Sequence, residues 1–188
     1  MNDVNPFAPP VDDGPPPVRA LAGTDPRFFA VSRNKFMVMC LATFGLYELY
    51  WFYRNWKRIK ERTRSDIWPV LRAFFALFFT HALLRDVTIA AAESDVRPRF
   101  KVQSAAWAFI GLTLLSRLPD PFWFVALLAF VPLVPVQDTI NDIHRRVAPN
   151  ADTNSGFGLG NWVVIGVGFI FWALSIASLF LPEEPIAP

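Results

Sequence analysis

Along residues 36–64, apolar, aromatic and basic side chains follow one another in the order expected of a helix that leaves a lipid bilayer. An apolar run, F-M-V-M-C-L-A-T-F-G-L-Y, comes first. The aromatic band that follows contains Tyr47, Tyr50, Trp51, Phe52, Tyr53 and Trp56, and the six cations are Arg54, Lys57, Arg58, Lys60, Arg62 and Arg64. Lipid tails suit apolar side chains, the headgroup level suits aromatic rings, and Lys and Arg collect on the cytoplasmic side. The order therefore predicts a membrane protein whose six cations contact lipid headgroups.

The composition favours lipid contact and argues against nucleic acid. Of the 188 residues, 53% are hydrophobic, a share above the globular norm. The net charge is only +2, and the cations gather at the ends of apolar segments, where membrane topology already explains them. We therefore expect a bilayer with anionic lipids as a partner and no nucleic acid.

Proline and charge divide the chain into three parts. Residues 1–35 hold seven of the 17 prolines and little apolar surface, so we expect a disordered proline-rich tail. Residues 36–182 are expected to form a helical membrane domain, and residues 183–188 a short tail. The predicted fold class is all-α, a polytopic membrane protein with four to five membrane-embedded helices.

The apolar segments differ in how well they suit a span. Residues 36–53 and 162–181 have spanning length, and the latter lie in the uncharged stretch 153–182. Residues 67–84 contain Pro69, Arg72 and His81, so they form either a tilted span or a re-entrant or interfacial helix. The shorter stretches 105–115 and 121–136 flank a proline-rich turn and predict a helical hairpin.

The distribution of cations separates the two arrangements of residues 67–84. If this segment spans, the basic loops 54–66 and 85–104 lie on opposite sides of the membrane. If it returns to its own side, both loops share the cytoplasm with Arg145 and Arg146, and the N-terminal tail lies outside. The positive-inside rule favours the re-entrant arrangement.

Glu48 is an acidic residue inside an otherwise uncharged apolar segment. Intramembrane carboxylates are costly and are usually paired or functional. Because Glu48 and Arg72 lie at matching depth if both helices meet one interface, we expect them to form a charge pair that clamps two helices together. A proton or ion site is the less favoured interpretation.

Other polar residues offer alternatives. His81 and Thr80 would line a polar path with Glu48 and Arg72 if the protein were a small transporter or channel subunit. Residues 137–146 predict an amphipathic interfacial helix, with a divalent-cation site as the weaker alternative. No nucleophile triad, zinc spacing or phosphate loop is present, so we expect no enzymatic activity, no metal and no cofactor.

The stretch T-F-G-L-Y-E-L-Y-W, residues 43–51, resembles a family of uncharacterised small bacterial inner-membrane proteins with a T-x-G-x-Y-x-x-Y-W first-span motif. The resemblance implies a multi-pass protein of the bacterial cytoplasmic membrane and no reaction. The opening N-P-F-A-P-P resembles proline-rich leaders that lie in the cytoplasm, which counts against an outside tail. We expect a non-enzymatic scaffold or modulator of membrane partners, with a homo-oligomer or another membrane protein as its partner.

Overall fold

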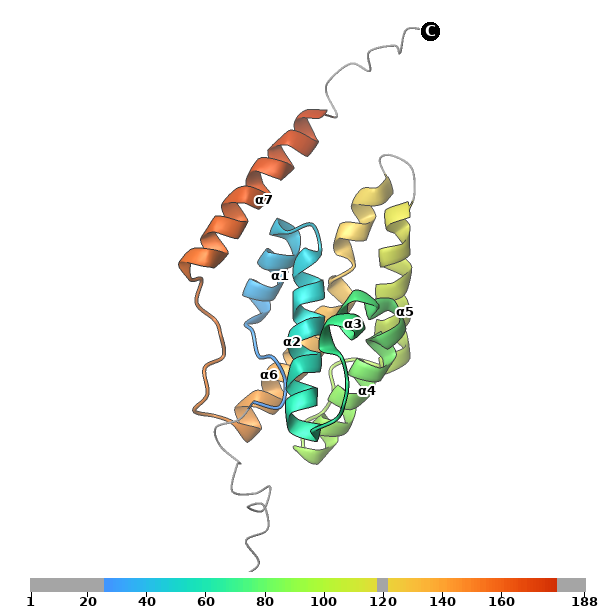
Figure 1. Ribbon diagram of the computed structural model, residues 1–188, viewed down its shortest axis with the longest axis vertical. Coiled ribbons are helices and arrows are strands. Elements are labelled where there is room, and N and C mark those ends of the chain that lie inside the picture. Colours follow the sequence, from blue (N-terminus) through green and yellow to red (C-terminus); the bar gives the residue numbers. More distant parts are fainter. Residues whose placement is uncertain (1–25, 118–121, 179–188) are drawn as a thin grey trace, which may run out of the picture.

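The computed structural model describes residues 26–117 and 122–178, and all regular elements in them are helices (Figure 1). These are α1 (Arg33–Ala42), α2 (Leu46–Thr63), α3 (Pro69–Phe74), α4 (Ala76–Glu93), α5 (Val102–Leu114), the 3₁₀ helices η2 (Leu115–Arg117), η3 (Phe122–Leu128) and η4 (Val131–Leu133), α6 (Val134–Val147) and α7 (Leu159–Ser178). The predicted all-α class is confirmed for this part of the chain.

Two helical segments in the described residues are long and apolar enough to cross a membrane. One runs over Phe124–Val147, through η3, η4 and α6, and the other is α7. Four to five spans are not confirmed, because α1, α3 and α5 are too short, and α2 and α4, each 18 residues long, are not apolar enough. With 13 residues, α5 extends only about 20 Å, which is less than a bilayer's hydrocarbon thickness.

The predicted helix over residues 36–53 is wrong, because the chain reverses at residues 43–45 and α2 runs back along α1 (Figure 1). Phe44 and Gly45 have positive φ angles of 51° and 86°, which no continuous right-handed helix allows. The Thr43 hydroxyl donates to the Met39 carbonyl at 2.8 Å and accepts from the Tyr47 amide at 2.9 Å. This hydroxyl therefore joins the end of α1 to the start of α2.

The segment 67–84 is also divided. Pro69 begins α3, where its fixed φ suits the first turn, and the helix ends after six residues. Phe75 separates α3 from α4, which runs on to Glu93. α3 packs against α2, so the segment 67–84 begins with a short helix that lies over α2 and does not form one straight helix (Figure 1).

Residues 26–35 do not belong to a disordered tail, whereas residues 1–25 and 179–188 lie outside the described residues. Phe28 and Val31 are buried against the helices, and Ser32 caps α1 by accepting from the Lys35 amide at 3.4 Å. Arg27 forms an ion pair with Glu93 at the end of α4, with 2.6 Å between Nη1 and Oε2. The start of the described chain therefore lies beside the ends of α2 and α4.

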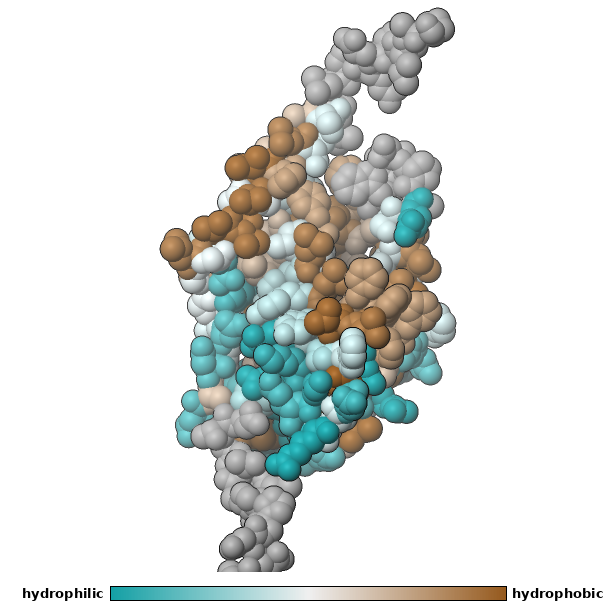
Figure 2. All heavy atoms as spheres, viewed as in Figure 1, coloured by the Kyte–Doolittle hydropathy of each residue, from teal (hydrophilic) through white to brown (hydrophobic). Residues whose placement is uncertain are grey.

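Polar and apolar surfaces separate along the molecule, as Figure 2 shows. Hydrophilic atoms gather around the lower ends of α2 and α4, whereas hydrophobic atoms cover α7 and the region of α3. The core between the helices combines aliphatic and aromatic residues, and its largest rings, Phe36, Trp51, Phe52 and Trp56, are each fully buried. The molecule thus has a basic end, an apolar end and a core of its own.

α7 lies apart from the other helices for most of its length (Figure 1). The structure describes all residues of α7, and among them only Gly168 is buried. Gly168 faces the Ala42 backbone at the end of α1. Trp172 Nε1 donates to the Leu41 carbonyl at 3.0 Å, and its ring stacks on Phe44 at 4.8 Å between centroids. The predicted helix over residues 162–181 is confirmed within the described residues, and one close crossing joins it to α1.

Candidate functional site

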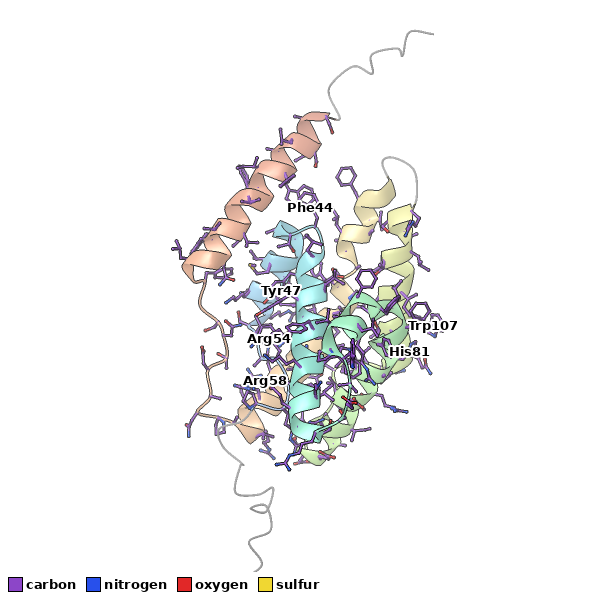
Figure 3. All side chains as sticks on the ribbon, in the orientation of Figure 1. Phe44, Tyr47, Arg54, Arg58, His81 and Trp107 are labelled. Carbon is purple, nitrogen blue, oxygen red and sulfur yellow. The ribbon has the colours of Figure 1, made fainter. Side chains whose placement is uncertain are left out.

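The basic half of α2 does not present all six cations to the outside. Arg54 lies over the rings of Phe29 at 4.9 Å and Tyr50 at 5.8 Å, and Arg62 lies over Phe28 at 5.3 Å. Such cation–π contacts hold the guanidinium groups against the protein's own N-terminal segment. Figure 3 shows Arg54 and Arg58 on the side of α2 away from His81 and Trp107. Arg58 also contacts Glu61, with 3.8 Å between Nη1 and Oε2.

The three remaining predicted headgroup contacts, Lys57, Lys60 and Arg64, line one open groove of about 800 Å³. Glu61 and Asp66 also line it, so the groove is not purely cationic. Pro69 and Val70 form its other wall at the start of α3. The groove therefore lies between the basic half of α2 and the apolar surface of α3.

The apolar surface beside this groove is large. Trp68, Val70, Phe74 and Phe78 are between 69% and 78% exposed. Isolated exposed apolar residues are normal, but a contiguous group of large ones indicates contact with lipid or with a partner. Cations and exposed apolar residues thus meet at one boundary, which is the arrangement that a lipid–water interface favours.

The expected pair of Glu48 and Arg72 does not form. Arg72 lies over the Trp56 ring at 4.4 Å and the Phe79 ring at 5.1 Å. Buried Glu48 Oε1 has no hydrogen-bond partner among the described residues. The prediction that Glu48 and Arg72 lie at the same depth required two straight helices side by side. Instead, α2 starts at Leu46 after a chain reversal, and α3 is a short helix packed on it. Arg72 of α3 therefore contacts α2 through the Trp56 ring and not through a carboxylate.

Glu48 instead lines a cavity of about 420 Å³ near the apolar end of the molecule. Its walls come from α2, α3, α4, α5 and η3, and they are mostly apolar. Four rings contribute: Phe44, Phe52, Phe74 and Phe109. Thr113 and Ser116 supply the two lining hydroxyls, and the described lining residues include no Lys, Arg or His.

The residues of the predicted polar path are not brought together. His81 Nε2 lies 2.9 Å from Gln103 Oε1, and its ring meets the edge of Trp107 at 5.4 Å on the α4–α5 surface (Figure 3). Thr80 is buried and donates its hydroxyl to the Ala76 carbonyl in its own helix. Neither residue lines the cavity that contains Glu48.

The predicted amphipathic face of residues 137–146 agrees with α6, where Ile140 and Ile143 are buried. Its carboxylates meet arginines: Asp138 contacts Arg33 at 3.4 Å, and Asp142 contacts Arg99 at 2.8 Å and also Arg145. In the part of the chain that the structure describes, no three His, Cys, Asp or Glu side chains gather as metal ligands.

A buried polar network that the sequence analysis missed joins α2, α6 and the N-terminal segment. Trp51 Nε1 donates to Gln137 Oε1, and Gln137 Nε2 donates to the Val31 carbonyl at 3.1 Å. Asn141 donates to the same carbonyl at 2.9 Å, and Asn55 accepts from the Phe29 amide at 3.0 Å. A signal was available, because an amide inside an aromatic helix end, such as Asn55, needs a hydrogen-bond partner when buried.

Comparisons with protein-family models, with curated proteins and with solved structures found no match for this chain. The resemblance to small bacterial inner-membrane proteins therefore stays a prediction from the motif at residues 43–51.

Proposed function

We propose that this protein is a membrane-embedded, non-enzymatic scaffold or modulator that holds anionic lipid headgroups at its basic end. The observation that carries the proposal is the groove lined by Lys57, Lys60 and Arg64 beside the exposed apolar face of α3. A phospholipid would place its headgroup among the cations and its acyl chains along Trp68 and Phe74. Bound lipid would then be the means by which the protein acts on neighbouring membrane proteins.

The arrangement of the helices supports one orientation. The basic residues of α2, the end of α4 and residues 26–32 lie together, as the Arg27–Glu93 ion pair and the contact of Arg62 with Phe28 require. Under the positive-inside rule this end faces the cytoplasm. In this proposal α7 crosses the bilayer of the bacterial inner membrane and the hairpin of α1 and α2 enters without crossing. Residues 26–32 then lie on the cytoplasmic side, in contrast to the outside tail that the distribution of cations predicted.

The proposal predicts a groove-specific loss of lipid binding. The triple variant Lys57→Gln, Lys60→Gln, Arg64→Gln should bind phosphatidylglycerol roughly a hundredfold more weakly, since each cation near an anionic surface contributes about 1 kcal/mol. Native mass spectrometry of the purified full-length protein in detergent would count the lipids retained. Phosphatidylcholine retention should not change between wild type and variant.

A matched control removes three exposed cations that do not line the groove: Arg85→Gln, Arg97→Gln, Lys101→Gln. This variant should keep most of its affinity for phosphatidylglycerol. Equal losses in the two triple variants would show diffuse attraction of the whole basic end, and the groove would then not be the lipid site.

The transporter alternative gains no support from the side-chain arrangement. Glu48, Arg72 and His81 contact three different sets of residues and form no common path among the described residues. The scaffold proposal is therefore preferred.

A further inference from the structure

The cavity that contains Glu48 is a second site, distinct from the basic groove. Glu48 is 7% exposed, and the described residues offer its Oε1 atom no hydrogen-bond donor. Burying a carboxylate without a donor or a counter-charge costs several kcal/mol, so such a group is either paired with a cation or holds a proton until a counter-charge is supplied. The nearest predicted counter-charge, Arg72, is engaged by Trp56 and Phe79.

The shape of the site suits a small organic molecule. Its volume of about 420 Å³ falls within the range of small-molecule pockets, about 300 to 1,000 Å³. Its rim includes the exposed residues Leu46, Leu49 and Phe74, so the cavity opens onto the apolar end of the protein. A molecule with an apolar body could therefore enter from the lipid side.

The chemistry of the walls selects the charge of that molecule. Rings of Phe44, Phe52 and Phe109 surround the space, and an aromatic face attracts a cation through its quadrupole. The Thr113 hydroxyl donates its proton to the Phe109 carbonyl at 2.8 Å, so its oxygen is left with only its acceptor capacity. A carboxylate, aromatic rings and hydroxyl acceptors, with no cationic side chain among the described lining residues, together complement a positive charge.

We propose that this cavity binds a lipophilic ammonium ion, an apolar body with one positive charge, whose cationic nitrogen lies against the Glu48 carboxylate. The ligand supplies the counter-charge that the described residues do not provide, and its apolar part fills the space between α2, α5 and η3. The site is independent of the anionic-lipid groove, so either can exist without the other.

The test uses benzyltrimethylammonium as the probe, with purified full-length protein in a nonionic maltoside detergent. Isothermal titration should detect saturable binding to wild type. Glu48→Gln keeps the shape and removes the charge, so affinity should fall roughly tenfold or more. This variant should fold at least as well as wild type, because an amide is less costly to bury than a carboxylate.

Two further variants separate the site from general charge effects. Asp86→Asn removes a carboxylate from α4, which also contributes to the cavity wall, at a position outside the cavity, and should leave affinity unchanged. Ala126→Phe keeps Glu48 but adds a ring to a residue that lines the cavity, so it should block the probe. Absence of saturable binding to wild type, or equal affinity in wild type and Glu48→Gln, would overturn the proposal.

Two sources could supply such a cation, and nanodiscs distinguish them. If the natural occupant is the choline headgroup of a lipid, phosphatidylcholine nanodiscs should weaken the Glu48-dependent binding of the probe relative to phosphatidylglycerol nanodiscs. If the occupant is a freely diffusing lipophilic cation, the Glu48-dependent affinity should be the same in both. Both results require that wild type binds the probe more tightly than Glu48→Gln does. If the two affinities are equal in a nanodisc of either lipid, the proposed site is refuted.

Discussion

The body formed by α1–α6 and the helix α7 are both rich in apolar residues, but different forces hold them in place. The body contains a core with buried aromatic rings and a buried network in which Gln137 hydrogen-bonds to the Trp51 indole and to the Val31 carbonyl. α7 meets the body at Gly168 and Trp172, and Lys35 holds the preceding loop by donating to Asn154 at 2.8 Å.

The difference follows from how each region satisfies its backbone and side chains. A 20-residue helix pairs its own backbone groups, so α7 needs few contacts with the body and can leave its sides to lipid. The irregular segment 26–32 cannot do this, and it is ordered because Asn55, Gln137 and Asn141 accept or donate the bonds that it lacks. The body is therefore expected to keep its shape without α7.

The largest effect is expected from breaking the network of the body with Gln137→Leu. The substitution keeps the volume of the side chain but leaves the Trp51 indole N–H buried without an acceptor. Each unsatisfied buried group costs about 1–3 kcal/mol, so we expect a loss of about 3 kcal/mol. For a chain of this size the unfolding midpoint should fall by roughly 6–12 °C, measured by thermal unfolding in detergent.

Gln103→Leu is the matched control, because Gln103 is exposed on α5 and its side chain hydrogen-bonds to His81 at the surface. Its midpoint should change by about 1–2 °C at most, since exposed substitutions usually have small effects. Equal shifts in the two variants would mean that the buried network does not hold the body together.

A smaller effect is expected from Gly168→Ala at the crossing of α7. A Cβ at this position would meet the Ala42 carbonyl oxygen at 1.9 Å, so one backbone must move. Overpacking of this kind costs about 1–3 kcal/mol, and the weakly held α7 should be the part that moves. Spin labels introduced by Lys57→Cys and Ile176→Cys, in a Cys40→Ala background, should show a broader distance distribution between the body and α7.

Gly166→Ala supplies the control, because a Cβ there would meet nothing within 4 Å. The distance distribution should then match that of wild type. If Gly168→Ala also leaves it unchanged, the crossing does not position α7.

The smallest effect is expected at the reversal between α1 and α2. Gly45 has a φ angle of 86°, which costs a residue with a Cβ about 1–2 kcal/mol, so Gly45→Ala should lower the unfolding midpoint by a few degrees. Gly111→Ala lies within α5, where an added Cβ would meet nothing within 4 Å, and it should leave the midpoint unchanged or raise it. Loss of stability in both would point to a general intolerance of added side chains at the apolar end.

The motif T-x-G-x-Y-x-x-Y-W illustrates why only part of the fold could be predicted. Its aromatic residues were expected to lie at a membrane interface along one span, and its apolar context supported that expectation. Thr43 and Gly45 instead form the reversal, and Trp51 is buried on Gln137, 86 residues away in sequence. Hydropathy reports how apolar a stretch is, and it does not report whether a glycine within it reverses the chain.

The sequence by itself determined the helical class, the long apolar helix α7 and the separation of basic from apolar segments, because these depend on local composition and on residue spacing. Tertiary structure alone decided that Arg72 packs on aromatic rings, that Glu48 lines a cavity without a partner, and that residues 26–35 are ordered. These features depend on contacts between residues far apart in the chain. Such contacts are set by how short helices pack, and no local pattern encodes them.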